Sequence, residues 1–143
     1  VLYCKTYMKK TIEKENYLKA IYKFKEKNNK VTVTALSNFF KVSKSTVSNM
    51  LNKLVKMGFI DTMPYKPIEL TSKGSKKAIE IISKHRLIEL YLVKEMNFTV
   101  DEVHEIAEEM EHITNSKFFN RIREILGDEF VDPHGSIIPK SEY

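Results

Sequence analysis

The chain has 143 residues and a hydrophobic content of 42%, enough for a folded core in one ordinary domain or two small ones. It contains no run of about 18 apolar residues and no signal-peptide pattern at its start, so we expect a cytoplasmic protein without a membrane partner. Its net charge of +5 conceals a division, because residues 1–77 hold 17 lysines against five acidic residues (+12) and residues 78–143 hold seven basic against 14 acidic residues (−7). The N-terminal part is therefore suited to a polyanion and the C-terminal part to cations.

The first predicted helix runs from about Lys10 to Lys27, where apolar residues recur at helical spacing. Residues 1–9 precede it and are expected to form a flexible tail, in which the only cysteine, Cys4, has no disulfide partner. A short second helix over residues 35–40 is expected to be capped by Thr34 and to bury Leu36, Phe39 and Phe40.

The next predicted helix gives the strongest nucleic-acid signal. Ser43 is expected to cap it and Gly58 to end it, and its apolar face consists of Val47, Met50, Leu51, Leu54 and Val55. The opposite face carries hydroxyls, amides and lysines, and no acidic residue occurs from Leu36 to Ile60. Such side chains can bond to base edges and phosphates, so this face suits the major groove of DNA. The candidate DNA contacts are Ser43, Lys44, Ser45, Thr46, Ser48, Asn49, Asn52 and Lys53.

Two short strands are predicted next, over residues 59–62 and 68–71, with a turn from Pro64 to Pro67 between them. This is the pattern of a β-wing, and Lys66 in the turn is a candidate phosphate contact. An ordinary helical hairpin is the alternative, but the wing, the basic charge and the acid-free helix face occur together. The pattern therefore predicts a winged helix-turn-helix that binds double-stranded DNA.

Histidines and glutamates at helical spacing distinguish the C-terminal half. His85 and Glu89 are four residues apart on a predicted helix over 72–96, so they project from one face. On the following predicted helix, one side carries His104, Glu108, Glu111 and His112, beside a separate apolar stripe. Imidazole and carboxylate ligands without a thiolate suit Mn, Fe(II), Zn, Co or Ni. Isolated pairs of this kind are more often salt bridges, but three of the four histidines belong to this arrangement, which predicts a site for a divalent transition metal.

The remaining histidine, His134, lies in the sequence DPHGS, and we interpret it as a turn residue rather than a ligand. A last helix is predicted to end before it, at Gly127. The apolar residues of the C-terminal helices exceed what a small domain needs for its own core, which predicts a homodimer. A two-fold dimer would read a palindromic operator, with recognition helices about one DNA turn apart or a multiple of it.

Five segments within about residues 10–140 form a recognisable set: ENYLKAIY, KVSKSTVSNMLNKLVKMGFI, LTSKG, KHRLIE and VHEIAEEMEHITN. Together they resemble the diphtheria toxin repressor and manganese transport regulator family of metal-dependent transcriptional repressors. The resemblance implies a mainly α fold, with a winged-helix DNA-binding domain over 1–72 and an all-helical metal-binding and dimerisation domain over 73–143. It also implies two metal sites at the junction of these domains. One would consist of His85, Glu89 and His104, and the other of Glu108, Glu111, His112 and, from the first helix, Asn16.

Two positions bear on the metal that the resemblance implies. Glu108 stands where iron-responsive members tend to carry Cys, which favours Mn, with Fe(II) second. Asn16 stands where the family usually has Asp or Met, and Lys19 where some manganese regulators are acidic. Asn offers only a neutral carbonyl oxygen, so we expect the second site to be weak, differently selective or assisted by Glu13 or Glu15. The chain ends at Tyr143 without the SH3-like third domain of longer members, so a ligand from that domain is not expected.

We therefore expect a metal-dependent transcriptional repressor that controls metal-ion homeostasis and is not an enzyme. One alternative is a winged-helix regulator that metal does not control, in which the His/Glu set is a polar network between helices. An alternative of another class is a metal-dependent hydrolase with an ion at His104, Glu108, Glu111 and His112. The hydrolase is disfavoured because the chain has no HExxH motif, nucleophile elbow or phosphate-binding glycine loop.

Overall fold

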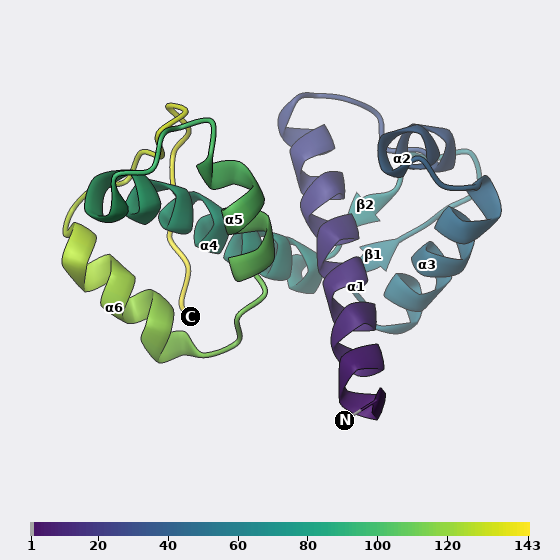
Figure 1. Cartoon of the computed structure of the whole chain (residues 1–143). Coiled ribbons are helices and arrows are strands. Elements are labelled where there is room, and N and C mark those ends of the chain that lie inside the picture. The colour runs from purple at the N-terminus through teal and green to yellow at the C-terminus, as the bar shows by residue number, and fades with distance from the viewer. Residues whose placement is uncertain (1) are drawn as a thin grey trace. The chain divides into compact units, whose positions relative to one another are not determined.

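The computed structural model describes residues 2–143, except the side chains of residues 2–4, 6 and 7. The side chain of Cys4, which we expected to have no disulfide partner, lies outside the described residues. The described part is mainly helical, with six helices and one two-stranded sheet (Figure 1). It divides into two compact units, one ending at Ala78 and the other beginning at Ile79. Among the described helices, none combines the length and apolar character that crossing a bilayer requires.

The first unit is a winged helix-turn-helix. Helices α1 (Leu2–Glu26), α2 (Val33–Phe40) and α3 (Lys44–Lys56) precede strands β1 (Ile60–Asp61) and β2 (Glu69–Leu70). The strands are antiparallel, and the chain between them forms the wing (Figure 1). The buried core takes apolar residues from all three helices and from the sheet, among them Leu18, Ile21, Leu36, Val47, Leu54 and Ile60.

The capping of α3 confirms the sequence prediction, whereas two expectations for α1 and α2 are wrong. Ser43 Oγ accepts a hydrogen bond from Thr46 N at 3.1 Å, and Gly58 follows the helix with a φ of 74°. The N-cap of α2 is Thr32, whose Oγ1 accepts a hydrogen bond from Ala35 N at 3.1 Å. Helix α2 therefore begins at Val33, two residues before the predicted start at residue 35. Helix α1 starts at Leu2, because residues 2–9 contain no Gly or Pro and are mostly compatible with a helix.

Two apolar residues that we expected in the core are exposed. Phe39 is 57% exposed and packs edge-to-face on Phe24 and Phe40 at the surface. Val55 is 40% exposed, because it lies at the edge of the apolar stripe of α3 that Leu51 and Leu54 occupy. The core of the first unit is therefore smaller than the periodicity alone predicted.

The second unit is helical. It contains most of α4 (Ser72–Met96), together with α5 (Val103–Met110) and α6 (Ser116–Leu126), and α6 ends at Gly127 with a φ of 62°, as predicted. After α6 the chain forms a short hairpin in which Val131 bridges Ile137, and Ile138 returns to the core. That core consists chiefly of Leu87, Ile88, Leu90, Leu92, Val103, Ala107, Phe119, Ile122 and Leu126.

The boundary between the units lies within α4, six residues beyond the expected boundary after residue 72. The beginning of α4 belongs to the first unit for two reasons. Ala78 is buried in the first core, and Gly74 lies so close to Phe59 that no Cβ would fit there. The helix is continuous through the boundary, so it covalently joins the winged helix to the helical unit.

Candidate functional site

The outer face of α3 presents the predicted DNA-reading side chains to solvent. Ser45, Asn49, Asn52 and Lys53 are exposed, and Ser48 is half-buried. Ser43 is committed to capping, since its Oγ also lies 2.9 Å from Ser45 Oγ and 2.8 Å from Thr46 Oγ1. The cap thus organises three hydroxyls at the start of the helix. Lys44 and Thr46 are exposed in the same turn.

The wing and α3 contribute to one surface of the first unit. Ser48 and Asn52 of α3 and Lys66 of the wing line the same hollow. Lys66 is exposed, and its neighbour Tyr65 is fully exposed with a φ of 62°. Amide, hydroxyl and ammonium groups therefore face solvent together, and this combination can bond to base edges and phosphates at once.

In the second unit, the buried His85 lies between two carboxylates. Its Nδ1 lies 2.6 Å from Glu111 Oε2 and its Nε2 lies 3.0 Å from Glu89 Oε1, so each ring nitrogen is within hydrogen-bond distance of a carboxylate. Glu89 is 2% exposed and Glu111 is 1% exposed. Burying two carboxylates is costly unless cationic or metallic partners compensate them, so this cluster is built for positive charge.

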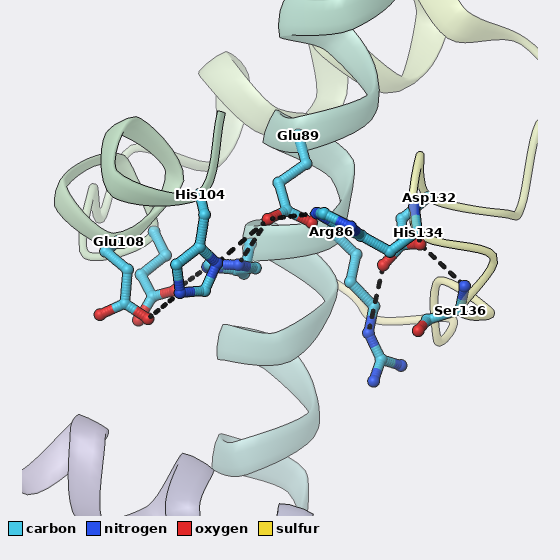
Figure 2. Close-up of polar contacts among 9 residues, drawn as sticks. Arg86, Glu89, His104, Glu108, Asp132, His134 and Ser136 are labelled. Atoms are coloured by element: carbon cyan, nitrogen blue, oxygen red, sulfur yellow. Dashed lines mark hydrogen bonds and ion pairs between the residues drawn. The ribbon is translucent and has the colours of Figure 1, made fainter. Parts of the chain in front are cut away.

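Glu89 is the point on which several imidazoles converge (Figure 2). Besides His85, His104 approaches Glu89 Oε1 with its Nδ1 at 3.3 Å. His104 also places its Nε2 3.7 Å from Glu108 Oε1. In the described part of the chain, His85, Glu89 and His104 each offer a ligand atom within 4.8 Å of the others. The structure thus brings together the first of the two predicted ligand sets.

The second predicted set is arranged differently from the expectation. The group whose ligand atoms lie within 4.8 Å of one another is His85, Glu108 and Glu111, so His85 takes part in both groups. The helix that carries these candidate ligands, α5, is also shorter than predicted and ends at Met110. Glu111 is its C-cap, and His112 lies in the following turn. His112 Nε2 nevertheless lies 3.4 Å from Glu111 Oε1, so it remains beside the group.

The charges of this cluster shift two pKa values. Burial lowers the pKa of His85, but its hydrogen bonds to Glu111 and Glu89 and the charges of these residues outweigh burial, so the pKa is raised. Burial raises the pKa of Glu89, but the hydrogen bond and charge of His85 outweigh that effect, so its pKa is lowered. The two neighbouring carboxylates thus favour the positively charged form of His85. A divalent ion can replace the proton of this form, since metal ligands bind in their deprotonated forms.

Two further residues bear on the metal ligands. Asn16, on α1 in the first unit, has a buried Oδ1 with no hydrogen-bond partner among the described residues. A buried carbonyl oxygen without a donor is unusual and is the kind of atom that an ion could satisfy. His134 lies in a turn, as predicted, but its Nε2 is 3.5 Å from Glu89 Oε1, which sequence reasoning missed. No local pattern predicts that contact, because it joins residues of α4 and of the hairpin after α6.

Comparison with known proteins places these observations in a family. Residues 10–68 match the family description "Iron dependent repressor, N-terminal DNA binding domain", and residues 71–140 match "Iron dependent repressor, metal binding and dimerisation domain". A helix-turn-helix-type transcriptional regulator of Methanocaldococcus jannaschii is 34% identical over 119 residues, which cover 82% of this chain and 94% of that protein. The chain belongs to the iron-dependent repressor family.

Longer members of the iron-dependent repressor family are also similar. The diphtheria toxin repressor of Corynebacterium glutamicum is 29% identical over 125 residues, which cover 87% of this chain and 55% of that protein. A solved structure described as a manganese-dependent transcriptional repressor in complex with manganese has a TM-score of 0.81 and 36% identity, covering 89% of this chain and 58% of that one. The chain thus spans little more than half the length of these two relatives. The two matched family domains confirm the predicted order, a DNA-binding domain followed by a metal-binding and dimerisation domain.

Proposed function

We propose that this protein is a metal-dependent transcriptional repressor that binds a palindromic operator as a homodimer and controls metal-ion homeostasis. The observation that carries the proposal is the buried cluster of His85, Glu89 and Glu111 in a unit of the metal-binding family, on the same chain as an acid-free recognition helix. Members of the family are repressors and not enzymes, which supports a binding function.

His85, Glu89 and His104 would hold one ion. His85 Nε2 and His104 Nδ1 already lie 3.0 and 3.3 Å from Glu89 Oε1, and the lowered pKa of Glu89 favours its charged form. An ion would supply positive charge beside these buried carboxylates. The donor set contains only imidazole and carboxylate, which suits the harder divalent metals of the first transition row.

Glu108, Glu111 and His112 would hold a second ion, with Asn16 as a further ligand. Support for the first three comes from the proximity of Glu108 to Glu111 and from the contact of His112 with Glu111, whereas Asn16 is added by the family resemblance. We propose Mn as the effector and Fe(II) as the second choice, because Glu108 offers a carboxylate where a soft-metal site would have a thiolate. The manganese bound by the similar repressor of known structure supports the same order.

Operator recognition would use the exposed face of α3. Ser45, Asn49 and Asn52 would read base edges, while Lys44, Lys53 and Lys66 would bond to phosphates. Thr46 and Ser48 would add hydroxyl contacts, and Ser43 would fix the start of the helix. Metal would act by favouring the arrangement of the dimer that fits DNA, with a coupling on the order of 1 to 3 kcal/mol.

A second candidate function is a winged-helix regulator that metal does not control. One observation favours it: both ring nitrogens of His85 already have carboxylate partners, so the network is satisfied as a purely structural one. The two proposals differ in what chelation does to DNA binding.

The test is operator binding with and without a chelator. A sequence selected from random DNA in the presence of Mn would serve as probe, and its affinity would be titrated against Mn, Fe(II), Zn and Co. We expect EDTA to weaken binding and Mn to restore it. The variant Glu108→Gln should lose this response, whereas the matched control Glu109→Gln, an exposed residue of the same helix, should keep it. Equal DNA affinity in EDTA and in Mn would establish the metal-independent regulator instead.

A further inference from the structure

Lys84, on α4, is a buried lysine that belongs neither to the two ligand sets nor to the DNA-reading surface. Its side chain is 7% exposed. A buried ammonium group is costly unless its charge is compensated and its three donors have partners. The partners of Lys84 therefore indicate what its burial achieves.

The ammonium group of Lys84 joins three parts of the second unit. Its Nζ donates a hydrogen bond to Glu80 Oε1 at 2.7 Å, one turn earlier on α4, and to Ile113 O at 3.2 Å, in the turn after α5. The same atom lies 4.8 Å from the centre of the Phe119 ring on α6, which is a cation–π distance. Glu80 compensates the charge, while Ile113 and Phe119 tie α4 to the turn and to α6.

The turn that Lys84 reaches carries two candidate metal ligands. Helix α5 ends at Met110, so Glu111 and His112 lie where no further helical turn fixes the backbone. Ile113 N still donates to Met110 O at 3.1 Å, but backbone groups beyond a helix end depend on other partners. Lys84 is such a partner for Ile113 O, one residue after His112. It thus attaches the turn to α4 next to the candidate ligands.

The candidate ligands in this turn depend on its exact position. Glu111 Oε2 lies 2.6 Å from His85 Nδ1 on α4, and Glu111 Oε1 lies 3.4 Å from His112 Nε2. A shift of the turn would therefore change the separation of the carboxylate from an imidazole on another helix. Metal ligands have to be held within about 0.5 Å of their productive geometry. An attachment at Ile113 is close enough in the chain to provide that precision.

The chemistry of Lys84 argues against two other roles. A protonated amine has no lone pair for a metal ion, so Lys84 is not itself a ligand. Stability alone is a weak reason for the lysine, because replacing a buried ion pair with apolar groups is often neutral. Glu80 is moreover 25% exposed, so its carboxylate can reach water without Lys84. The directed hydrogen bond to Ile113 O is what an apolar side chain could not provide.

We propose that Lys84 is a positioning residue of the second metal site, which holds the turn after α5 so that Glu111 and His112 face the ion. The inference rests on the proposed metal-binding function. It assigns to a buried cation the task of fixing two ligands to which it does not itself bond through its side chain.

Co²⁺ titration of the full chain in two backgrounds tests the proposal, because the visible absorption of Co²⁺ reports binding and ligand set. In a His104→Ala background, which weakens the first site, Lys84→Met should lower the Co²⁺ affinity about tenfold. Lys84→Arg should recover part of that loss, since it keeps the charge and the donors. In a His112→Ala background, where the first site remains, Lys84→Met should change the affinity by less than about twofold.

The matched control is Lys117→Met, which removes an exposed lysine of the same unit and should leave the Co²⁺ affinity unchanged in both backgrounds. Thermal unfolding of the metal-free variants checks folding. If Lys84→Met does not fold, Lys84→Gln replaces it, because its amide is polar but too short to keep both contacts.

Three results would overturn the proposal. An unchanged affinity for Lys84→Met in the His104→Ala background would remove Lys84 from the site, while the proposed function would stand if the unaltered protein still requires metal to bind DNA. Equal losses in the two backgrounds would mean that Lys84 supports the whole unit rather than the second site. A Lys84→Arg variant as weak as Lys84→Met would contradict the role of the donated hydrogen bond. Failure of the unaltered protein to bind Co²⁺ or Mn²⁺ would refute the proposed function as well.

Discussion

Gly74, near the start of α4, allows this helix to pack closely against the backbone of Phe59. Substitution of Gly74 tests this close approach. A Cβ at Gly74 would lie 1.9 Å from Phe59 O and 2.9 Å from Phe59 C, both backbone atoms. Phe59 O also accepts a hydrogen bond from Thr71 N at 3.0 Å, and Thr71 Oγ1 accepts one from Gly74 N at 3.1 Å. Gly74→Ala must therefore displace the backbone just before β1, where the wing begins.

The sign of the stability change separates this contact from ordinary helix propensity. In an unconstrained helix, Gly→Ala would stabilise by about 0.8 to 1.0 kcal/mol. Overpacking against a rigid backbone costs about 1 to 3 kcal/mol or more. Since a separation of 1.9 Å is far inside van der Waals contact, we expect the upper part of that range and a net loss of about 1 to 2 kcal/mol.

Urea unfolding of Gly74→Ala measures this loss, and Lys76→Ala is the matched control. Lys76 is exposed on the same part of α4, so its substitution should change the free energy of unfolding by less than about 0.5 kcal/mol. Operator affinity should fall in Gly74→Ala because the wing that carries Lys66 moves. An increase in stability would refute the close approach of α4 to Phe59, and with it the argument that α4 belongs partly to the first unit.

Three further predictions concern DNA reading and metal coupling. Asn49→Ala should weaken binding to the operator by about 1 to 3 kcal/mol and binding to random DNA much less, whereas Lys53→Ala should weaken both alike and reduce the salt dependence of log K by about one unit. Fluorescence anisotropy at several salt concentrations measures both effects. Equal losses on both DNAs for Asn49→Ala would remove Asn49 from the residues that read bases. His112→Ala should abolish the metal-activated increase in operator affinity and leave a folded dimer by sedimentation, so activation that survives in this variant would refute the ligand assignment. Asn16→Asp should tighten Mn²⁺ binding and lower the Mn²⁺ concentration needed for operator binding, because a carboxylate adds an anionic hard oxygen; calorimetry that shows no change would place Asn16 outside the coordination shell.

Much of the first unit could be predicted because its signals are local. Ser43 and Gly58 bound α3 through the chemistry of their own positions, and the polar face of that helix follows from a repeat of 3.6 residues. The choice between Thr32 and Thr34 as the cap of α2 could not be made in this way. Either threonine hydroxyl could accept the capping hydrogen bond. In the structure Thr32 is the cap, and Val33, the first residue of α2, packs against the core.

The metal cluster shows where sequence reasoning stops. Helical spacing placed His85 with Glu89 and His104 with Glu108, but the bond from His85 to Glu111 joins two helices and depends on how α4 and the end of α5 pack. The contact of His134 with Glu89 depends on the same tertiary packing. The sequence DPHG indicated a turn, which the structure contains, but it did not indicate that the histidine of this turn lies near Glu89.

The central claim is that metal binding and operator binding are coupled in this chain, and thermodynamic reciprocity tests it most directly. Mn²⁺ affinity would be measured by calorimetry with and without saturating operator DNA, and operator affinity with and without saturating Mn²⁺. Because coupling is reciprocal, the account predicts that both affinities rise by the same factor, about 5- to 150-fold. A Mn²⁺ affinity that operator DNA leaves unchanged would contradict the account, even if Mn²⁺ binds tightly.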